Sequence, residues 1–210
     1  RPLQHIPHPA LPREGGGEKE GVINPLHPPA QLAVTDAALN ANNRAGEWRR
    51  APDMPGHNME LKIEPLRLAD MDEVMRIERL SFPNPWTRGM FENELQNPVS
   101  FAFAARAGGK GPGAGPGGII AYSIFWIVQG EAHILNLAVD PEWRRKGVAL
   151  TLLQSILDFM RPRTVFEVFL EVRMSNTAAV RLYKGLGFRE ACVRKKYYGD
   201  EDAIVMSLEM

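Results

Sequence analysis

A strand that runs through a basic turn into a helix is the feature that most constrains this chain. Residues 136–153 read NLAVDPEWRRKGVALTLL: an apolar run, then Asp140-Pro141, then a basic stretch ending at Gly147, then a helical pattern. A turn of this kind at a helix start leaves backbone N–H groups unpaired at the positive end of the helix dipole, which suits a pyrophosphate. We therefore predict that this segment binds an acyl-coenzyme.

Composition places the chain among globular proteins and excludes several classes. The 210 residues are 44% hydrophobic and 24% charged, which is enough for one sizeable core. The 25 basic and 25 acidic residues cancel and leave no electrostatic footprint for general nucleic-acid binding. The single Cys192 cannot form an internal disulfide, and no apolar run has the length of a membrane span. We expect a cytoplasmic protein that binds neither membrane nor nucleic acid directly.

Residues 1–58 differ in composition from the rest. They hold nine of the 17 prolines and the Gly15–Gly17 run, without sustained apolar periodicity. Such a segment is expected to be a disordered Pro/Gly-rich extension, and its histidines stand at irregular spacing that does not indicate a metal site. Met59 is the expected natural start, so one domain is predicted over residues 59–210.

Apolar patterns in that domain predict an α/β (α+β) fold: a mixed, mostly antiparallel twisted sheet of about six to seven strands flanked by about four helices. Strands are expected at residues 61–68, 100–106, 119–128, 133–139, 165–172, 188–194 and 203–208. The Gly108–Gly118 segment, with seven glycines and two prolines, is expected to be a flexible hairpin loop rather than a phosphate loop, because no strand leads through it into a helix.

Helix starts are indicated by caps. Asp70-x-x-Glu73 resembles a capping box, and Thr87 is a plausible N-cap with Trp86 and Phe91 placed as a hydrophobic staple. Gly147 and either Ser175 or Asn176 precede the remaining two helices. The residues expected to face the core are Met71, Val74, Ile77 and Leu80 in the first helix and Ala149, Leu152, Leu153, Ile156 and Met160 in the third.

Several short motifs now narrow the assignment. Arg144-Arg145-Lys146-Gly147-Val148-Ala149 fits the pattern Gln/Arg-x-x-Gly-x-Gly/Ala of a known phosphate loop. The other motifs are Phe82-Pro83-x-Pro85-Trp86, Glu171-Val172-Arg173, Ser175-Asn176, Leu182-Tyr183-x-x-Leu186-Gly187-Phe188, Arg194-x-x-Tyr197-Tyr198 and Glu201-Asp202-Ala203. With them the chain resembles, from Met59 to Met210, the GNAT acetyltransferase superfamily, and within it the RimI-like ribosomal-protein alanine N-acetyltransferases.

The resemblance implies a GNAT fold and a direct, ternary-complex transfer of acetyl from acetyl-CoA to the α-amine of an N-terminal alanine. The implied partner is the N-terminal segment of a small-subunit ribosomal protein. The implied contacts to the pantetheine arm are the strand backbone of Leu137, Ala138 and Val139. Those to the pyrophosphate are Arg145, Lys146, Gly147, Val148, Ala149 and Leu150. Asn176 is a further implied acetyl-CoA contact, although helix capping would explain it equally well.

Glu171 and Tyr183 are the predicted catalytic pair, at the spacing that the resemblance implies. Glu171 ends a strand that is otherwise mostly apolar, so partial desolvation should raise its pKa toward the range useful for a general base. The alternative is a carboxylate paired with Arg173 or another cation. The Tyr183 phenol can donate a proton or a hydrogen bond to the leaving thiolate. Its alternative role is that of a core tyrosine.

The remaining residues have ordinary or alternative interpretations. Cys192 has no neighbouring histidine in sequence and is expected to be buried filler, and no metal is expected, because neither Cys nor His recurs at ligand spacing. His133 is expected to be an ordinary strand residue. Residues 194–202 form either a wall of the acceptor groove or a solvated hairpin tip, with Trp86 and Phe82 on the opposite wall. An enzyme for small amines and a silent acyl-CoA sensor are the alternative functions.

Overall fold

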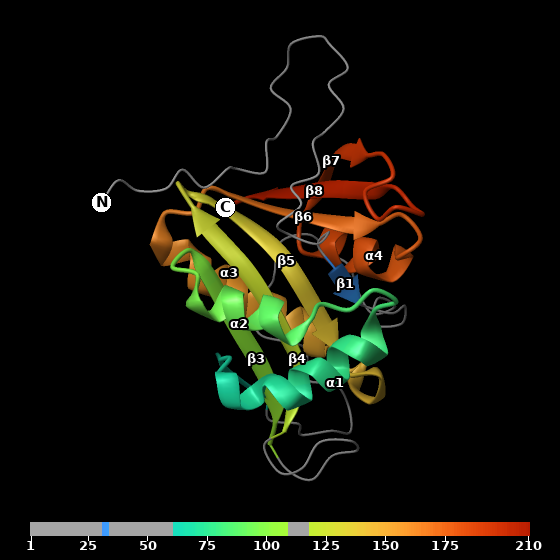
Figure 1. Cartoon of the computed structure of the whole chain (residues 1–210). Coiled ribbons are helices and arrows are strands. Elements are labelled where there is room, and N and C mark those ends of the chain that lie inside the picture. Colours follow the sequence, from blue (N-terminus) through green and yellow to red (C-terminus); the bar gives the residue numbers. More distant parts are fainter. Residues whose placement is uncertain (1–30, 34–60, 109–117) are drawn as a thin grey trace, which may run out of the picture.

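A twisted sheet of mixed strand direction organises the fold in the computed structural model, which describes residues 31–33, 61–108 and 118–210. The strands are β1 Gln31–Ala33, β2 Leu61–Pro65, β3 Ser100–Ala107, β4 Ile119–Val128, β5 Glu131–Val139, β6 Glu167–Arg173, β7 Arg189–Arg194 and β8 Ala203–Glu209. The helices are α1 Met71–Ser81, α2 Arg88–Gln96, α3 Val148–Met160 and α4 Thr177–Gly185. This is the predicted α/β class (Figure 1).

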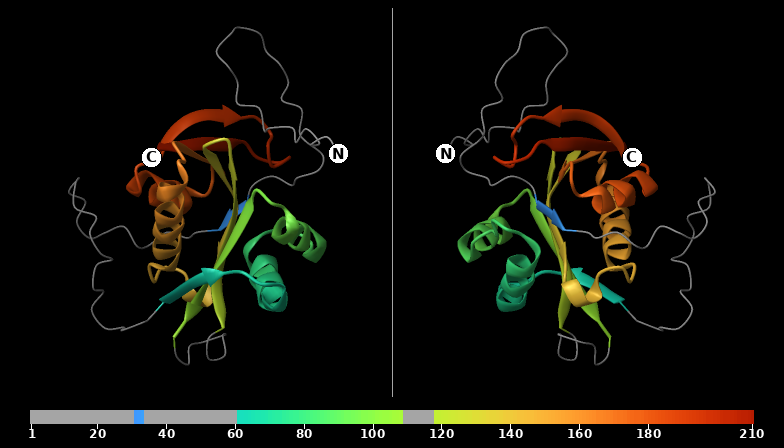
Figure 2. Two further views of the ribbon diagram at one scale, coloured as in Figure 1. Left: turned by 90° about the vertical axis from the view of Figure 1, so that its left-hand side faces the viewer. Right: turned by 90° about the vertical axis from the view of Figure 1, so that its right-hand side faces the viewer.

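The sheet order is β2-β3-β4-β5-β6-β8-β7, with β1 beside β5 (Figure 1). Only β5–β6 and β1–β5 are parallel pairs among the described strands. Helices α1 and α2 cover one face, and α3 and α4 cover the other (Figure 2). No helix in these ranges is long and apolar enough to cross a membrane.

The two central parallel strands separate soon after they meet. β5 pairs with β6 only from Glu131–Glu167 to Ile134–Leu170. On its other edge, β5 pairs with β4 through a bulge that leaves Leu135 without a partner, because Phe125 faces Ile134 and Ile124 faces Asn136. A bulge bends a strand and changes which face its side chains take. The sheet therefore opens between β5 and β6 at this point.

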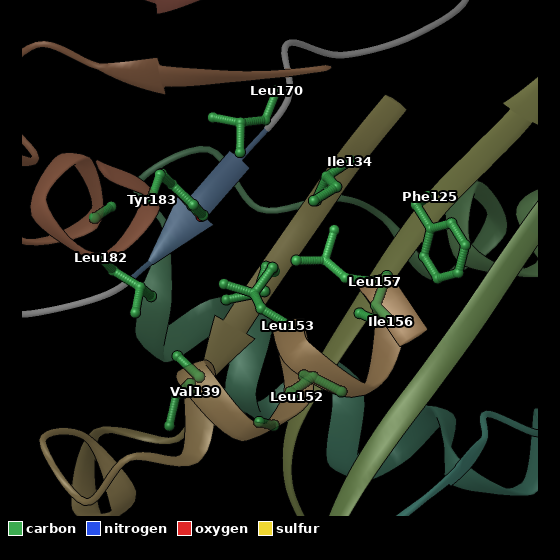
Figure 3. Close-up of a cluster of buried hydrophobic side chains, with 14 of the residues drawn as sticks. Phe125, Ile134, Val139, Leu152, Leu153, Ile156, Leu157, Leu170, Leu182 and Tyr183 are labelled. Atoms are coloured by element: carbon green, nitrogen blue, oxygen red, sulfur yellow. The ribbon is translucent and has the colours of Figure 1, made fainter. Parts of the chain in front are cut away.

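The predicted stripe of α3 is confirmed as the core of one face. Its five residues are buried and pack with apolar residues of β4, β5, β6 and α4. Figure 3 shows Leu152, Leu153, Ile156 and Leu157 among Phe125, Ile134 and Leu170. A second cluster, built on Met71, Val74, Ile77, Phe91 and Tyr122, fills the space under α1 and α2.

Helix α1 corrects two predictions. Leu80 is 56% exposed rather than inward, and Glu78 is fully buried in its place. A helix turns by 100° per residue, so residues spaced by three do not stay on one face. Leu80, nine residues after Met71, lies on the opposite side of the helix from Met71. Glu78, seven residues after Met71, lies on the same face as Met71. The capping box is also wrong, because Glu73 accepts a hydrogen bond from the Ile119 amide at 2.6 Å instead of capping its own helix.

Other boundaries agree with small shifts. Thr87 precedes α2, and the rings of Trp86 and Phe91 lie 5.3 Å apart, which confirms the staple. The cap of α4 is Asn176, whose Oδ1 accepts from the Ala179 amide at 3.1 Å. β2 ends at Pro65, β6 runs from Glu167 to Arg173, and β7 begins one residue after Phe188.

The predicted extension contains one described element, β1. The remaining residues of 1–58, Met59 and residues 109–117 of the glycine-rich loop lie outside the described ranges. A domain boundary at residue 58 therefore stays a prediction.

The burial of Ile77 and the exposure of Leu80 on α1 can be tested by measuring the free energy of unfolding of two variants. Ile77→Ala should lower the free energy of unfolding by about 2–5 kcal/mol, because it removes methyl groups from a closed core. Leu80→Ala on the same helix is the matched control and should change it by about 0.5 kcal/mol or less. Urea titrations of both variants measure the two values, and equal losses would contradict the observed orientation of α1.

Candidate functional site

The turn between β5 and α3 is anchored to helix α1. Asp140 Oδ2 lies 2.6 Å from Arg76 Nη2. The Arg144 guanidinium donates to Val139 O and to Ser81 Oγ, both at 2.9 Å. These contacts connect the end of β5 and the basic turn to the middle and the last turn of α1, so the start of α3 has a fixed position relative to the opposite face of the sheet.

The basic loop uses left-handed backbone before α3. Gly147 has φ 76° and is the N-cap, and Arg145 has φ 66°. Glycine adopts such a conformation without the steric penalty of an L side chain. A Cβ at Gly147 would meet nothing within 4 Å. The backbone conformation therefore explains the glycine, and a ligand can approach this backbone closely.

Backbone donors gather in the first turn of α3. The Thr151 amide donates to Gly147 O at 3.0 Å, which closes the first turn of the helix. The amides of Val148, Ala149 and Leu150 come before it and have no carbonyl four residues back within the helix. The exposed side chains of Arg145 and Lys146 precede them. The structure thus brings all six predicted pyrophosphate contacts to one helix start, and their chemistry suits an anion.

β5 presents a strand edge beyond its last pair with β6. Gln31–Ala33 lie along this edge in parallel, with Leu32 opposite Leu137 and Ala33 opposite Ala138. Two of the three residues predicted to contact a pantetheine arm are therefore paired with β1. The carbonyl of the third, Val139, accepts from Arg144.

Glu171 lies on β6, one residue past the last pair with β5. Its Oε1 is 2.9 Å from Arg194 Nη1 of β7. Burial raises the pKa of Glu171, and the Arg194 guanidinium opposes this shift without cancelling it. The predicted alternative of an ion pair is thus present, with Arg194 rather than Arg173, while the pKa still moves in the direction that suits a base at neutral pH.

Tyr183 lies on α4 at the opposite face of the sheet. It is fully buried in the α3 cluster beside Leu182 (Figure 3), and its ring centroid is 5.7 Å from that of Phe188. Among the described residues its hydroxyl has no hydrogen-bond partner. Burial raises the pKa of Tyr183, which keeps the phenol protonated. A core tyrosine would usually satisfy its hydroxyl, so the unpaired O–H favours a role with a ligand.

Glu171 and Tyr183 belong to different faces. Val168, Leu170 and Val172 of β6 pack on the α3 side, so the alternating residue Glu171 points to the α1 side. The predicted pair therefore flanks the separation of β5 and β6 from two sides of the sheet.

The segment between β7 and β8 is held against the end of β6. Arg173 lies 3.0 Å from Asp200 and 3.1 Å from Glu201, and its guanidinium is 4.2 Å from the Tyr198 ring centroid. Tyr198 Oη also donates to Glu171 O at 3.3 Å. The predicted groove wall thus touches the backbone of the candidate base, which a solvated hairpin tip would not require.

Sequence reasoning missed one ion-pair partner and one buried cluster near the site. Arg194 stood in a recognised motif, but its pairing with Glu171 depends on β7 and β6 lying near one another across β8. The cluster of Glu78, Tyr122 and Asn136 was also missed. Its signal was the position of Glu78 at seven residues after Met71, on the buried stripe of the helix.

Three other predictions concern ordinary residues. His133 lies in β5 as predicted and stacks on Phe169, with ring centroids 5.3 Å apart. Cys192 is partly buried in β7 rather than fully buried. Across the described ranges no group of three or more His, Cys, Asp or Glu side chains could hold a metal ion.

Comparison with known proteins agrees with this geometry. The model of the Acetyltransferase (GNAT) family matches residues 71–188. The [Ribosomal protein bS18]-alanine N-acetyltransferase of Escherichia coli (strain K12) is 35% identical over 151 residues, which cover 70% of this chain and 95% of that protein. The crystal structure of the ribosomal-protein-S18-alanine N-acetyltransferase from Escherichia coli superposes with a TM-score of 0.63 at 34% identity, over 71% of this chain and 94% of that one.

A more distant structure supports the fold alone. Arabidopsis thaliana NAA60 in complex with acetyl-CoA has a TM-score of 0.66 at 21% identity, covering 72% of this chain and 99% of that one.

The ion pair at Glu171 predicts a direction for its titration. Arg194→Gln removes a positive charge that stabilises the carboxylate, so the pKa of Glu171 should rise further. Carbon-13 NMR titration of the Glu171 carboxyl in wild type and variant measures this change. Lys184→Gln, which removes an equal charge that pairs with Glu190 instead, is the control and should leave the pKa of Glu171 unchanged. A lower or unaltered pKa in Arg194→Gln would contradict the electrostatic account.

Proposed function

Because this chain belongs to the GNAT acetyltransferase family, we propose that it transfers the acetyl group of acetyl-CoA to the α-amine of an N-terminal alanine on a protein. The proposed acceptor is a small-subunit ribosomal protein in the cytoplasm. The observation that carries the proposal is the 35% identity to the Escherichia coli enzyme over 95% of its length. The site supports it, because it combines a helix start that suits an anion, a β5 edge that lacks a β6 partner and is covered by β1, and two candidate catalytic groups.

The acetyl-CoA contacts follow from the backbone. In this proposal the pyrophosphate lies at the amides of Val148, Ala149 and Leu150, where the helix dipole and exposed basic side chains stabilise negative charge. The amide groups of the pantetheine arm pair with the β5 edge at Leu137 and Ala138, as an added strand would. The side-chain oxygen of Asn176 caps α4, and Asn176 is also a proposed contact to acetyl-CoA.

Glu171 is the proposed general base. The incoming amine is mostly protonated near neutral pH, since an α-amino group has a reference pKa of about 7.7–8.0. A carboxylate whose pKa is raised by burial accepts that proton more readily than an exposed one. The neutral amine then attacks the thioester carbonyl, and a backbone N–H near Val139 is the proposed donor to the oxyanion. The C–S bond then breaks, and the second proton that the nitrogen loses on becoming an amide passes to the departing thiolate.

Tyr183 is the proposed donor to the leaving sulfur. A simple thiol has a pKa of about 8.5, well below that of a buried phenol. Complete proton transfer from Tyr183 to the thiolate is therefore unfavourable, and a hydrogen bond from its unpaired hydroxyl is the favoured role. Its isolation from other acceptors keeps this O–H free for the sulfur.

The acceptor test uses a hexapeptide that begins Ala-Arg-Tyr. Wild-type protein should acetylate this peptide with acetyl-CoA, and should not acetylate its N-blocked twin or spermidine. Glu171→Gln should lower kcat/KM by about 10²–10⁴-fold, the range for loss of a general base. Glu167→Gln, four residues earlier on β6, is the matched control and should keep wild-type activity.

Each other result has a definite meaning. Turnover of spermidine in place of the peptide would identify a small-amine enzyme. Tight acetyl-CoA binding without turnover of any amine would identify a silent sensor. Full activity in Glu171→Gln would remove Glu171 from the mechanism.

The position of β1 predicts competition with acetyl-CoA. Gln31–Ala33 pair with the same stretch of β5 that the pantetheine arm needs, so only the fraction of molecules with β1 released can bind. Replacing residues 31–33 by Pro-Gly-Pro should tighten acetyl-CoA binding by about two- to tenfold, because proline cannot donate to the strand pair. Calorimetry measures the affinity, and the same replacement at residues 4–6 is the control. Unchanged affinity would contradict competition at this edge.

A further inference from the structure

A buried polar cluster on the α1 face holds the side chain of Asn136. Glu78 and Asn136 are both fully buried, and Asn136 Nδ2 lies 3.4 Å from each Glu78 carboxylate oxygen. Glu78 Oε1 also accepts from the Trp86 amide at 2.7 Å, and Oε2 accepts from the Tyr122 hydroxyl. Every contact at this carboxylate therefore comes from a donor.

These donors fix the direction of the Asn136 amide. An ionised carboxylate only accepts hydrogen bonds, so the NH₂ end of Asn136 faces Glu78 and the carbonyl end faces away. Asn136 Oδ1 is buried and has no hydrogen-bond partner among the described residues. An unsatisfied buried acceptor is destabilising, and such an atom calls for an explanation, of which a ligand is one.

The bulge places this oxygen beside the separation of the strands. Ile134 and Leu137 pack in the α3 cluster, whereas Leu135 packs in the cluster under α1. Asn136 contacts Glu78 of α1, so two consecutive residues of β5 face the same side. This double placement is the expected effect of a bulge at Leu135.

Glu171 lies on that same side. Phe169, two residues before it on β6, stacks on His133 of β5, and Glu171 shares its face by alternation. The last pair between the two strands is Ile134 with Leu170. Glu171 is thus one residue, and Asn136 two residues, beyond the point where their strands part.

We propose that Asn136 Oδ1 accepts a hydrogen bond from the α-amine of the acceptor, opposite the Glu171 carboxylate. The inference rests on the proposed function and adds a substrate-binding residue to it. With one N–H directed to Asn136 and a proton given to Glu171, the amine is neutral, and rotation about its Cα–N bond turns the new lone pair from Glu171 toward the thioester while another N–H still faces Asn136. Glu78 is then a positioning residue, which acts by orienting the Asn136 amide.

The test compares peptides with and without a free amine. Asn136→Ala should weaken binding of the Ala-Arg-Tyr hexapeptide to the CoA-saturated protein by about tenfold, the loss expected for one hydrogen bond from a charged donor. Binding of a peptide with propionyl in place of the N-terminal alanine should change by less than about twofold, since that peptide has no nitrogen, and so no N–H to donate, at this position. In turnover, KM for the peptide should rise.

Ser123→Ala is the matched control. Ser123 is also fully buried, and its hydroxyl has no hydrogen-bond partner in the described part of the chain. It lies on β4 opposite Leu137 and therefore faces α3. Both peptides should bind this variant as they bind wild type. Equal weakening of the two peptides by Asn136→Ala would show a structural role and overturn the assignment.

A measurement on the wild-type protein covers the case in which Asn136→Ala does not fold. The carbon-13 signal of the Asn136 carboxamide should shift when the free-amine peptide is added. A peptide with propionyl in place of the N-terminal alanine should leave it in place. Identical shifts with both peptides would overturn the role of Asn136 but not the proposed function. A wild-type protein that acetylates no peptide would overturn the proposed function together with it.

Discussion

The early parting of β5 and β6 is the constraint on which the site depends. Only four residues of each strand pair, and the bulge at Leu135 turns β5 away on the side where β6 would continue. Backbone groups that are exposed in this way inside a sheet need partners, which a strand or an amide-rich ligand can supply. Glu171 lies beside this opening on one face of the sheet, and Tyr183 lies on the other face. A fully paired central sheet would have buried these backbone groups and kept the two side chains apart.

Two carboxylates next to this opening, Glu78 fully buried and Glu171 partly buried, have different surroundings. Glu171 combines burial with the Arg194 guanidinium, and Glu78 combines burial with neutral donors from Trp86, Tyr122 and Asn136. Burial raises both pKa values, and the partners oppose it in each case. Glu171 lies at the open end of the strand pair and can exchange a proton with a ligand. Glu78 is sealed under α1, so its effect on a ligand passes through the side chain that it orients.

Local patterns in the sequence predicted most of the fold and part of the site. The helix start after Gly147, the cap at Ser175 or Asn176 and the Trp86–Phe91 staple depend on near neighbours, and the structure confirms the helix start, a cap at Asn176 and the staple. Leu80 was misplaced because a spacing of three was extended too far around the helix. Arg194 was missed as a partner of Glu171 because strand order decides that contact. No local pattern in β5 predicts the bulge at Leu135, since the bulge depends on how β4 and β5 align.

β1 and the proposed pantetheine arm use the same strand edge of β5, because the backbone groups there need hydrogen-bond partners. Residues 136–138 have backbone groups that lack a β6 partner, and β1 supplies a partner in parallel. Exchanging β1 for a pantetheine arm replaces backbone hydrogen bonds with amide hydrogen bonds of the same kind, so the exchange itself changes the free energy little. The anion site at the start of α3 has no counterpart in the β1 pairing. In the proposed function, the pyrophosphate contacts would therefore favour the coenzyme over β1, and the helix start, rather than the strand edge, would set its affinity.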